Sequence, residues 1–132
     1  MKRIFTVLAS LCLGLAAYAQ QQPQQPDYYE LAEKETERLQ RAVKLEDWQL
    51  FYVDSTLVTD YTGLAEEIGK LQANKVSNTS MYQMVQDKWM EKIDASYKKF
   101  FTEEQWAAYL KQGAAKAQKQ RAKRAAKMGT VK

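Results

Sequence analysis

An apolar stripe at helical spacing runs along the middle of the chain and restricts it to a helical fold. At 100° per residue, seven apolar side chains fall within an arc of roughly 80°. They are Leu50, Val53, Leu57, Tyr61, Leu64, Ile68 and Leu71. Gly63 and Gly69 interrupt the stripe and indicate a bend or a close approach by a neighbouring backbone. The stripe predicts one long helix over residues 46–74, whose apolar face needs partners to cover it.

Start signals predict three further helices. A possible capping box beginning at Asp27 opens a helix that ends at about residue 44, with Tyr28 and Leu31 among the residues expected to pack. A turn precedes Ser80, which opens a helix ending near residue 100. Thr102 caps a fourth helix and gives the strongest start signal in the chain. Because no segment alternates at a period of two, the chain is predicted to be all-α, with about four helices in an extended hairpin or bundle.

Residues 1–19 have the form of a cleaved signal peptide. A positive start at Lys2 and Arg3 precedes a short apolar core, and Ala-Tyr-Ala ends at residue 19. We therefore expect cleavage before Gln20 and a periplasmic location, with secretion as the alternative. Lipidation of Cys12 is not favoured, because Leu11 stands where a small residue is needed.

After the signal peptide, the chain lacks histidine and cysteine, on which most zinc sites and all disulfides depend. It contains no histidine, and its lone cysteine lies within the signal peptide. Zinc ligation of the usual kind and disulfide bracing are therefore excluded after cleavage, and we expect neither metal nor cofactor. Two adjacent carboxylate pairs, Glu66-Glu67 and Glu103-Glu104, point about 100° apart on a helix and do not converge on a substrate. The sequence thus favours a binding protein over an enzyme.

Charge and composition divide the chain into four parts. After the signal, residues 20–26 form a Gln/Pro-rich spacer, and residues 27–110 form the helical domain. Residues 20–110 carry a net charge of −6, whereas residues 111–132 carry +8 without an acid. The basic tail is predicted to be a helix partly outside the core that frays.

The basic tail is also a candidate anion-binding segment. Its candidate residues are Lys116, Lys119, Arg121, Lys123, Arg124 and Lys127. A solvated helix and a tether to anionic lipid or polysaccharide both remain open. Specific nucleic-acid recognition is not expected, since no aromatic residue follows Tyr109.

Two stretches share the spacing of an apolar residue, three further residues and a glutamine. They are Leu45 to Gln49 and Phe101 to Gln105. The simpler interpretation is that two helices merely begin alike. The pair also resembles the Leu-Thr-x-x-Gln motifs of the Spy and CpxP family of periplasmic chaperones and stress regulators. The chain departs from that pattern with Phe101 in place of leucine and Glu46 in place of threonine.

The resemblance, which covers roughly residues 45–110, implies an envelope protein that forms a thin, curved helical homodimer. It implies a concave face that holds non-native proteins without nucleotide. The residues carried over by the resemblance are Leu45, Gln49, Phe101, Thr102 and Gln105. Their expected role is to shape helix ends.

Large side chains outside the apolar stripes are the candidate client-binding residues. Trp48 and Tyr52 lie on the far side of the long helix from Leu50, and the favoured interpretation is that they pack under the first helix. The alternative is that they are exposed and bind a partner. Met81, Met84 and Met90 lie off their helix's stripe and fill core gaps or form an adaptable binding surface.

Two functional hypotheses follow from these features. The first is an ATP-independent periplasmic chaperone or envelope-stress adaptor that binds non-native proteins or an envelope sensor. The second is a non-enzymatic helical scaffold tethered by its basic tail to an anionic polymer or membrane. Deleting residues 111–132 should abolish binding in the second case and largely spare activity in the first.

Overall fold

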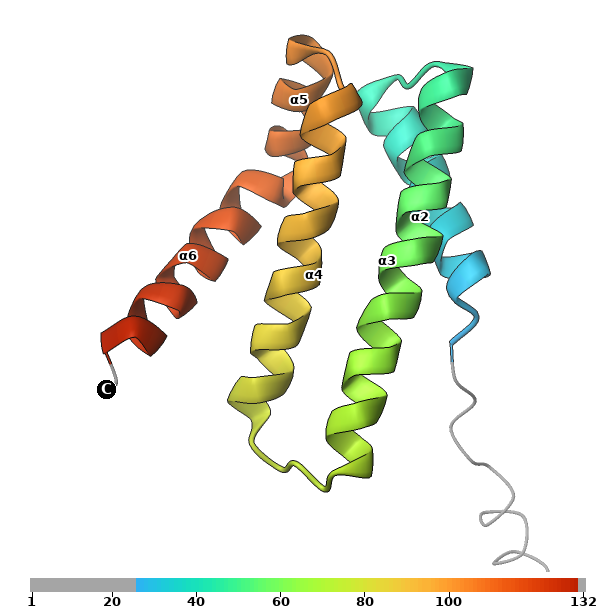
Figure 1. Cartoon of the computed structure of the whole chain (residues 1–132). Helices are drawn as coiled ribbons and strands as arrows, with labels where there is room; N and C mark the ends of the chain where they lie inside the picture. The colour runs from blue at the N-terminus through green and yellow to red at the C-terminus, as the bar shows by residue number, and fades with distance from the viewer. Residues whose placement is uncertain (1–25, 131–132) are drawn as a thin grey trace, which may run out of the picture.

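The computed structural model describes residues 26–130, and the predictions for the signal peptide and nearly all of the spacer lie outside this part of the chain. The described residues form helices joined by short turns, so the all-α prediction is confirmed (Figure 1). The helices are α2 (Tyr28–Val43), α3 (Asp47–Ala73), α4 (Thr79–Phe100), α5 (Glu103–Tyr109) and α6 (Ala115–Thr130).

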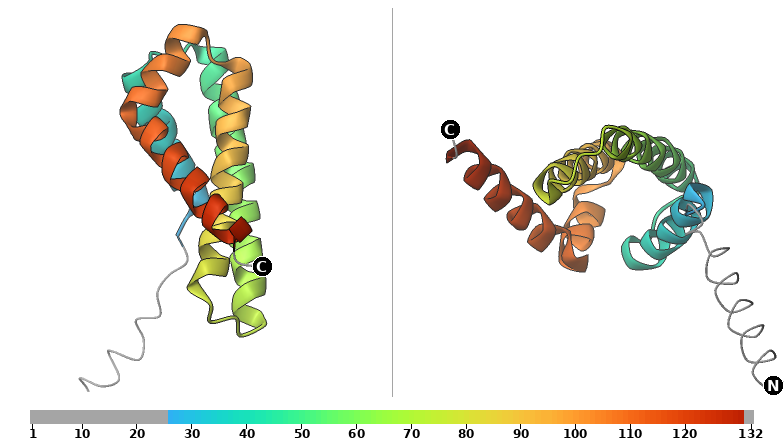
Figure 2. Two further views of the ribbon diagram at one scale, coloured as in Figure 1. Left: turned by 90° about the vertical axis from the view of Figure 1, so that its left-hand side faces the viewer. Right: turned by 90° about the horizontal axis from the view of Figure 1, so that it is seen from below.

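The helices form a curved row around a long antiparallel hairpin. α3 and α4 make the hairpin, α2 packs on α3, and α6 lies on the other side of α4 (Figures 1 and 2). Seen along the hairpin, the row is an arch with α2 at one edge and α6 at the other (Figure 2). α5 covers the end of the hairpin at which α3 begins and α4 ends, and it contacts α2.

The helix starts follow the capping signals with two differences. The Asp27 carboxylate accepts the backbone N–H of Tyr29 at 3.0 Å, whereas Glu30 forms an ion pair with Lys34 instead of completing a capping box. α4 begins earlier than predicted, because the Asn78 side chain accepts the N–H of Ser80 at 2.9 Å. Asparagine is a strong helix cap, so it takes the role predicted for the serine.

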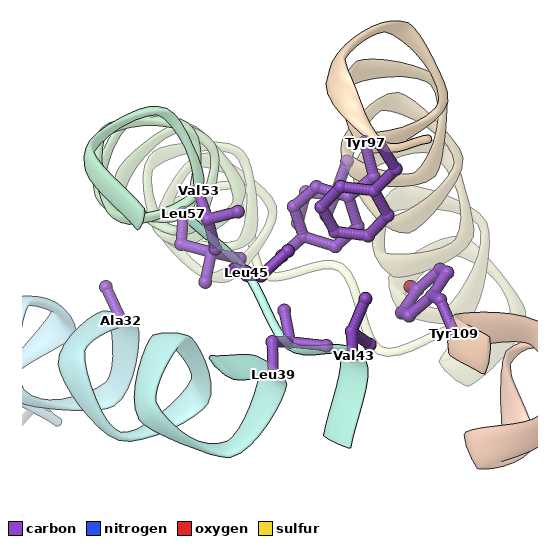
Figure 3. Packing of buried hydrophobic residues seen from close by; sticks show 10 residues of the cluster. Ala32, Leu39, Val43, Leu45, Val53, Leu57, Tyr97 and Tyr109 are labelled. Carbon is purple, nitrogen blue, oxygen red and sulfur yellow. The ribbon is translucent and has the colours of Figure 1, made fainter. Parts of the chain in front are cut away.

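The core lies at one end of the hairpin. Val53 and Leu57 from the apolar stripe are buried against Leu39 and Val43 of α2 (Figure 3). Leu31 was expected to pack but is 41% exposed, and Ala32 is buried instead. The small side chain of alanine suits the close contact of α2 with α3.

Aromatic rings complete the core beneath α5. Tyr97 stacks on Phe101 with ring centroids 5.0 Å apart and meets the edge of Tyr109 at 5.3 Å (Figure 3). Burial raises the pKa of the Tyr97 hydroxyl above its usual range. By contrast, the far half of the hairpin, residues 61–92, contains no fully buried residue. The far half of the hairpin is therefore a thin arm that extends from a one-ended core.

Gly63 allows α3 and α4 to approach each other along this arm. A Cβ atom on Gly63 would lie 2.3 Å from the outer edge of the Trp89 ring. The space beside the glycine is therefore filled by an aromatic ring and not by a neighbouring backbone. Trp89 also lies under Lys92, whose ammonium group is 4.6 Å from the ring centroid. The expected close approach by a neighbouring backbone is therefore wrong: a side chain fills the space at Gly63, and nothing lies within 4 Å of a Cβ at Gly69.

We expect Gly63→Ala to lower the free energy of unfolding by about 1–2 kcal/mol, because overpacking at Trp89 outweighs the gain in helix propensity. Gly69→Ala is the matched control, since nothing lies within 4 Å of the added Cβ. It should raise stability by up to about 1 kcal/mol. Urea unfolding of the two variants measures both effects. Equal and stabilising changes at both sites would contradict the packing of Trp89 on Gly63.

A wide turn at Leu110–Ala114 joins α5 to α6. Within it, Gly113 has a φ of 108°, a conformation that residues with a Cβ atom rarely adopt. This glycine bends the chain so that α6 runs back on the outer side of α4 and slants away from it toward the C-terminus (Figure 1). The basic tail is thus helical to Thr130.

Candidate functional site

The two motif glutamines lie face to face where α3 and α5 begin. Nε2 of Gln49 donates to Oε1 of Gln105 at 2.6 Å, and Nε2 of Gln105 donates to Oε1 of Gln49 at 2.8 Å. Gln49 is only 1% exposed, so its amide depends on these protein partners. The reciprocal pair ties together two helix starts that are 56 residues apart in sequence.

The other bonds of the two amides follow one pattern on both sides. Each Oε1 also accepts the backbone N–H of its own helix cap, Glu46 at 2.9 Å and Thr102 at 3.0 Å. Each Nε2 also donates to the carbonyl just before the other motif, Phe100 at 2.9 Å and Lys44 at 3.1 Å. The two motifs are therefore related by a local twofold arrangement of hydrogen bonds.

The structure places the other motif residues around this amide pair. The hydroxyl of Thr102 accepts the N–H of Gln105 at 3.1 Å. Leu45 and Phe101 are buried in the core directly beside the two helix starts. Sequence reasoning missed the bond between the motifs, although their identical spacing was the signal for it.

An aromatic surface lies on the outer side of these helix starts. Trp48 and Tyr52 are 50% and 51% exposed, so the expectation that they pack under α2 is wrong. Tyr52 instead contacts the Phe100 ring at the end of α4, with centroids 5.9 Å apart. Phe51, which sequence reasoning missed, is 69% exposed and meets the edge of Tyr52 at 5.7 Å. We call Trp48, Phe51, Tyr52 and Phe100 the aromatic surface.

The aromatic surface is shaped by short local contacts. The indole Nε1 of Trp48 donates to the Glu46 carboxylate at 2.7 Å, which orients the ring at the edge of the surface. Trp48, Tyr52 and Phe100 line a shallow hollow together with Lys99 and Thr102. Because exposed rings grouped in this way present apolar area to water, the hollow is suited to an apolar side chain of a partner.

The three candidate methionines do not join this surface. Met81 and Met84 are 42% and 48% exposed, but they lie in the first turns of α4, at the opposite end of the hairpin. Met90 is partly buried and packs against the core. The exposed methionines therefore form a second, separate apolar area at the end of the arm.

Two arginines of the basic tail are bound within the protein. Arg121 is 5% exposed and forms an ion pair with Asp94, which also accepts the Tyr109 hydroxyl at 2.5 Å. Arg124 bonds the Asp87 carboxylate with Nε at 2.7 Å and Nη2 at 2.8 Å. Their assignment to an anion-binding surface is therefore wrong for this structure, because both guanidinium groups already hold carboxylates of α4.

These pairs also alter the titration of their partners. The hydrogen bonds from Arg124 lower the pKa of Asp87 below its usual value. The stability that this pair contributes is therefore present above the ordinary carboxyl pKa and is lost as the pH falls through the folded-state value. Burial and the bond to Asp94 raise the pKa of Tyr109.

The lysines of α6 have a different environment. Lys116, Lys119, Lys123 and Lys127 are all exposed. At 100° per residue they fall within an arc of about 80°, away from the face that carries the two arginines. We call these four residues the lysine stripe, and any attraction of α6 for anions depends on it more than on the two arginines.

Residues 26–130 contain no group of histidine, cysteine, aspartate or glutamate side chains placed to hold a metal ion. Within the same range, no helix has the length and apolar character required to cross a bilayer. No family model, curated protein or solved structure matches the chain.

Proposed function

We propose that this protein is an exported, ATP-independent chaperone or stress adaptor that binds non-native proteins through its aromatic surface. The observation that carries the proposal is the group of exposed rings at Trp48, Phe51 and Tyr52. Aromatic side chains that are exposed together are the usual anchors of binding surfaces, because each buries a large apolar area with few rotatable bonds.

The hydrogen-bonded motifs support this role by fixing the backbone beneath the rings. Trp48 and Tyr52 flank Gln49, whose amide is held by the reciprocal pair. The rings are therefore attached to a rigid helix start and do not have to be ordered when a partner binds, which lowers the entropic cost of association. Binding and release require only association equilibria, so no nucleotide or cofactor enters the proposal.

Location outside the cytoplasm is part of the same proposal and is supported by the sequence of residues 1–19. A periplasmic protein works without a supply of nucleotide, which suits a surface that acts by binding alone. The resemblance of the paired motifs to those of Spy and CpxP proteins adds to this support, and the face-to-face glutamines give both motifs a common structural role.

We expect the double variant Trp48→Ser/Tyr52→Ser to weaken suppression of the aggregation of a model unfolding protein. Loss of two aromatic anchors should reduce client affinity at least about tenfold, since hot-spot aromatics contribute on the order of 2 kcal/mol or more each. Light scattering of the client at several protein concentrations measures the shift.

The matched control is Ser55→Ala/Thr59→Ala, which alters exposed residues of the same helix. It should leave suppression unchanged. Circular dichroism must show that both variants remain helical. Full suppression by the folded aromatic variant would rule out the aromatic surface as the binding site, and a parallel Met81→Ser/Met84→Ser variant tests the second apolar area.

A further inference from the structure

A groove between α2 and α3 combines an apolar floor with carboxylates that have no partner. Its apolar lining comes from Tyr29 of α2 and from three residues of α3. The α3 residues are Leu50, Phe51 and Val58. Tyr29 is 72% exposed and Phe51 is 69% exposed, so the groove is open to a ligand.

Three acidic side chains border this groove. Glu33 and Glu37 stand one turn apart on α2, and Asp54 faces them from α3. Within residues 26–130 these three carboxylates make no ion pair; the i,i+4 pair of Glu37 with Arg41 is not formed. An apolar groove bordered by unpaired acids is complementary to a segment that carries both basic and apolar groups.

The same chain presents such a segment at its other edge. Lys116, Lys119 and Lys123 of the lysine stripe have no acidic partner in the described part of the chain. Beside the stripe, exposed alanines run along α6 on the side away from the arginines. They are Ala115, Ala122 and Ala126. Alanines permit close approach, and the lysine stems can cover apolar rings while their ammonium groups reach carboxylates.

The lysines of α6 and the glutamates of α2 have the same spacing along their helices. Lys119 and Lys123 are separated by four residues, as are Glu33 and Glu37, so two helices lying side by side bring both pairs into register. The arginines cannot supply these contacts, because they are held by carboxylates of α4.

One copy cannot satisfy both rows by itself, since α2 and α6 lie at opposite edges of the arch (Figure 2). We propose that the groove between α2 and α3 takes the lysine stripe of α6 from a second copy of this chain. When each copy inserts its α6 into the groove of the other, two equivalent contacts close a dimer. This interface shares Phe51 with the aromatic surface but uses neither Trp48 nor Tyr52, so substitutions at those two residues separate the two proposals.

Two charge-reversal variants of the purified protein test the interface. The groove variant is Glu33→Lys/Glu37→Lys, and the stripe variant is Lys119→Glu/Lys123→Glu. By sedimentation, the wild type should have about twice the monomer mass at low salt and approach the monomer mass at high salt, because exposed ion pairs are screened. Each variant alone should be monomeric, since its groove and its stripe then carry the same sign.

An equal mixture of the two variants gives the sharpest result. The reversed groove of one variant meets the reversed stripe of the other, and the remaining groove and stripe keep their natural charges. The mixture should therefore recover the dimer mass. Glu66→Lys/Glu91→Lys, a reversal of two exposed acids outside the groove, is the control with the same change in net charge and should remain dimeric.

A monomeric wild type at low salt would overturn the inference, as would variants that still dimerise or a mixture that stays monomeric. If the wild type were monomeric and the groove variant no longer protected clients from aggregation, the groove would be a client-binding site. If the stripe variant instead lost binding to vesicles of anionic lipid, the stripe would be a membrane contact. A monomer whose protection depends on Trp48 and Tyr52 would leave the proposed function intact.

Discussion

Replacing Arg121 with methionine should lower the free energy of unfolding by about 3–5 kcal/mol, the range seen when one partner of a buried ion pair is removed. Arg121 and Asp94 have side chains that are only 6% and 9% exposed. Without the guanidinium, the Asp94 carboxylate would retain only the hydroxyl of Tyr109 and the amide of Gln118, at 3.2 Å, as partners. Urea denaturation followed by circular dichroism measures the loss.

Lys123→Met on the exposed side of α6 is the matched control and should change stability by less than about 0.5 kcal/mol. Arg121→Lys should fall between the two, because it keeps the charge but loses the planar donor geometry. A loss at Arg121→Met no larger than that of the control would show that the pair does not hold α6 against α4.

Gln49→Leu should be the second most damaging substitution, with an expected loss of about 2–4 kcal/mol. The change removes the reciprocal amide pair and leaves the N–H of Glu46 and the carbonyl of Phe100 without their present partners. Each buried polar group left in that state costs about 1–3 kcal/mol. Denaturant unfolding of the variant checks this value.

The double-mutant cycle with Gln105→Leu tests whether the two glutamines act as a unit. The double variant should be less destabilised than the sum of the two single variants, because each single change already breaks the shared bonds. Gln72→Leu, at an exposed position near the end of α3, is the control for glutamine loss alone. Additive effects at Gln49 and Gln105 would contradict the reciprocal pair.

The apolar stripe predicted α3 almost to its ends, because helical periodicity over many residues is a strong signal. Residues 46–74 were predicted and Asp47–Ala73 are found. The cap at Thr102 was equally clear, since its hydroxyl and the Gln105 side chain act within four residues of each other. Interactions between residues close in sequence can therefore be predicted from short stretches of the chain.

The environment of Trp48 and Tyr52 was not predictable in the same way. Their position off the stripe is consistent with packing under α2 or with exposure, and the choice depends on where α2 crosses α3. The structure turns Tyr52 toward Phe100, which is far away in sequence. Only the tertiary arrangement decides between the two outcomes.

The basic tail shows a similar limit. Arg121 and Arg124 look like members of one cationic run, yet each is held by a carboxylate of α4. Deletion of residues 111–132 would therefore remove structural ion pairs together with the exposed lysines. Substitution of the lysines alone separates a tethering role from the stability of the fold.

The one-ended core has a mechanical consequence. Residues 61–92 include no fully buried residue, and their apolar side chains, such as Leu64, Ile68 and Val85, are only partly buried, so the distal part of the hairpin should open more readily than its base. The reciprocal amide pair and the stacked rings of the core, where α3 begins and α4 ends, would persist during such fluctuations. The molecule thus combines a firmly packed base with a distal hairpin that is held by fewer buried contacts.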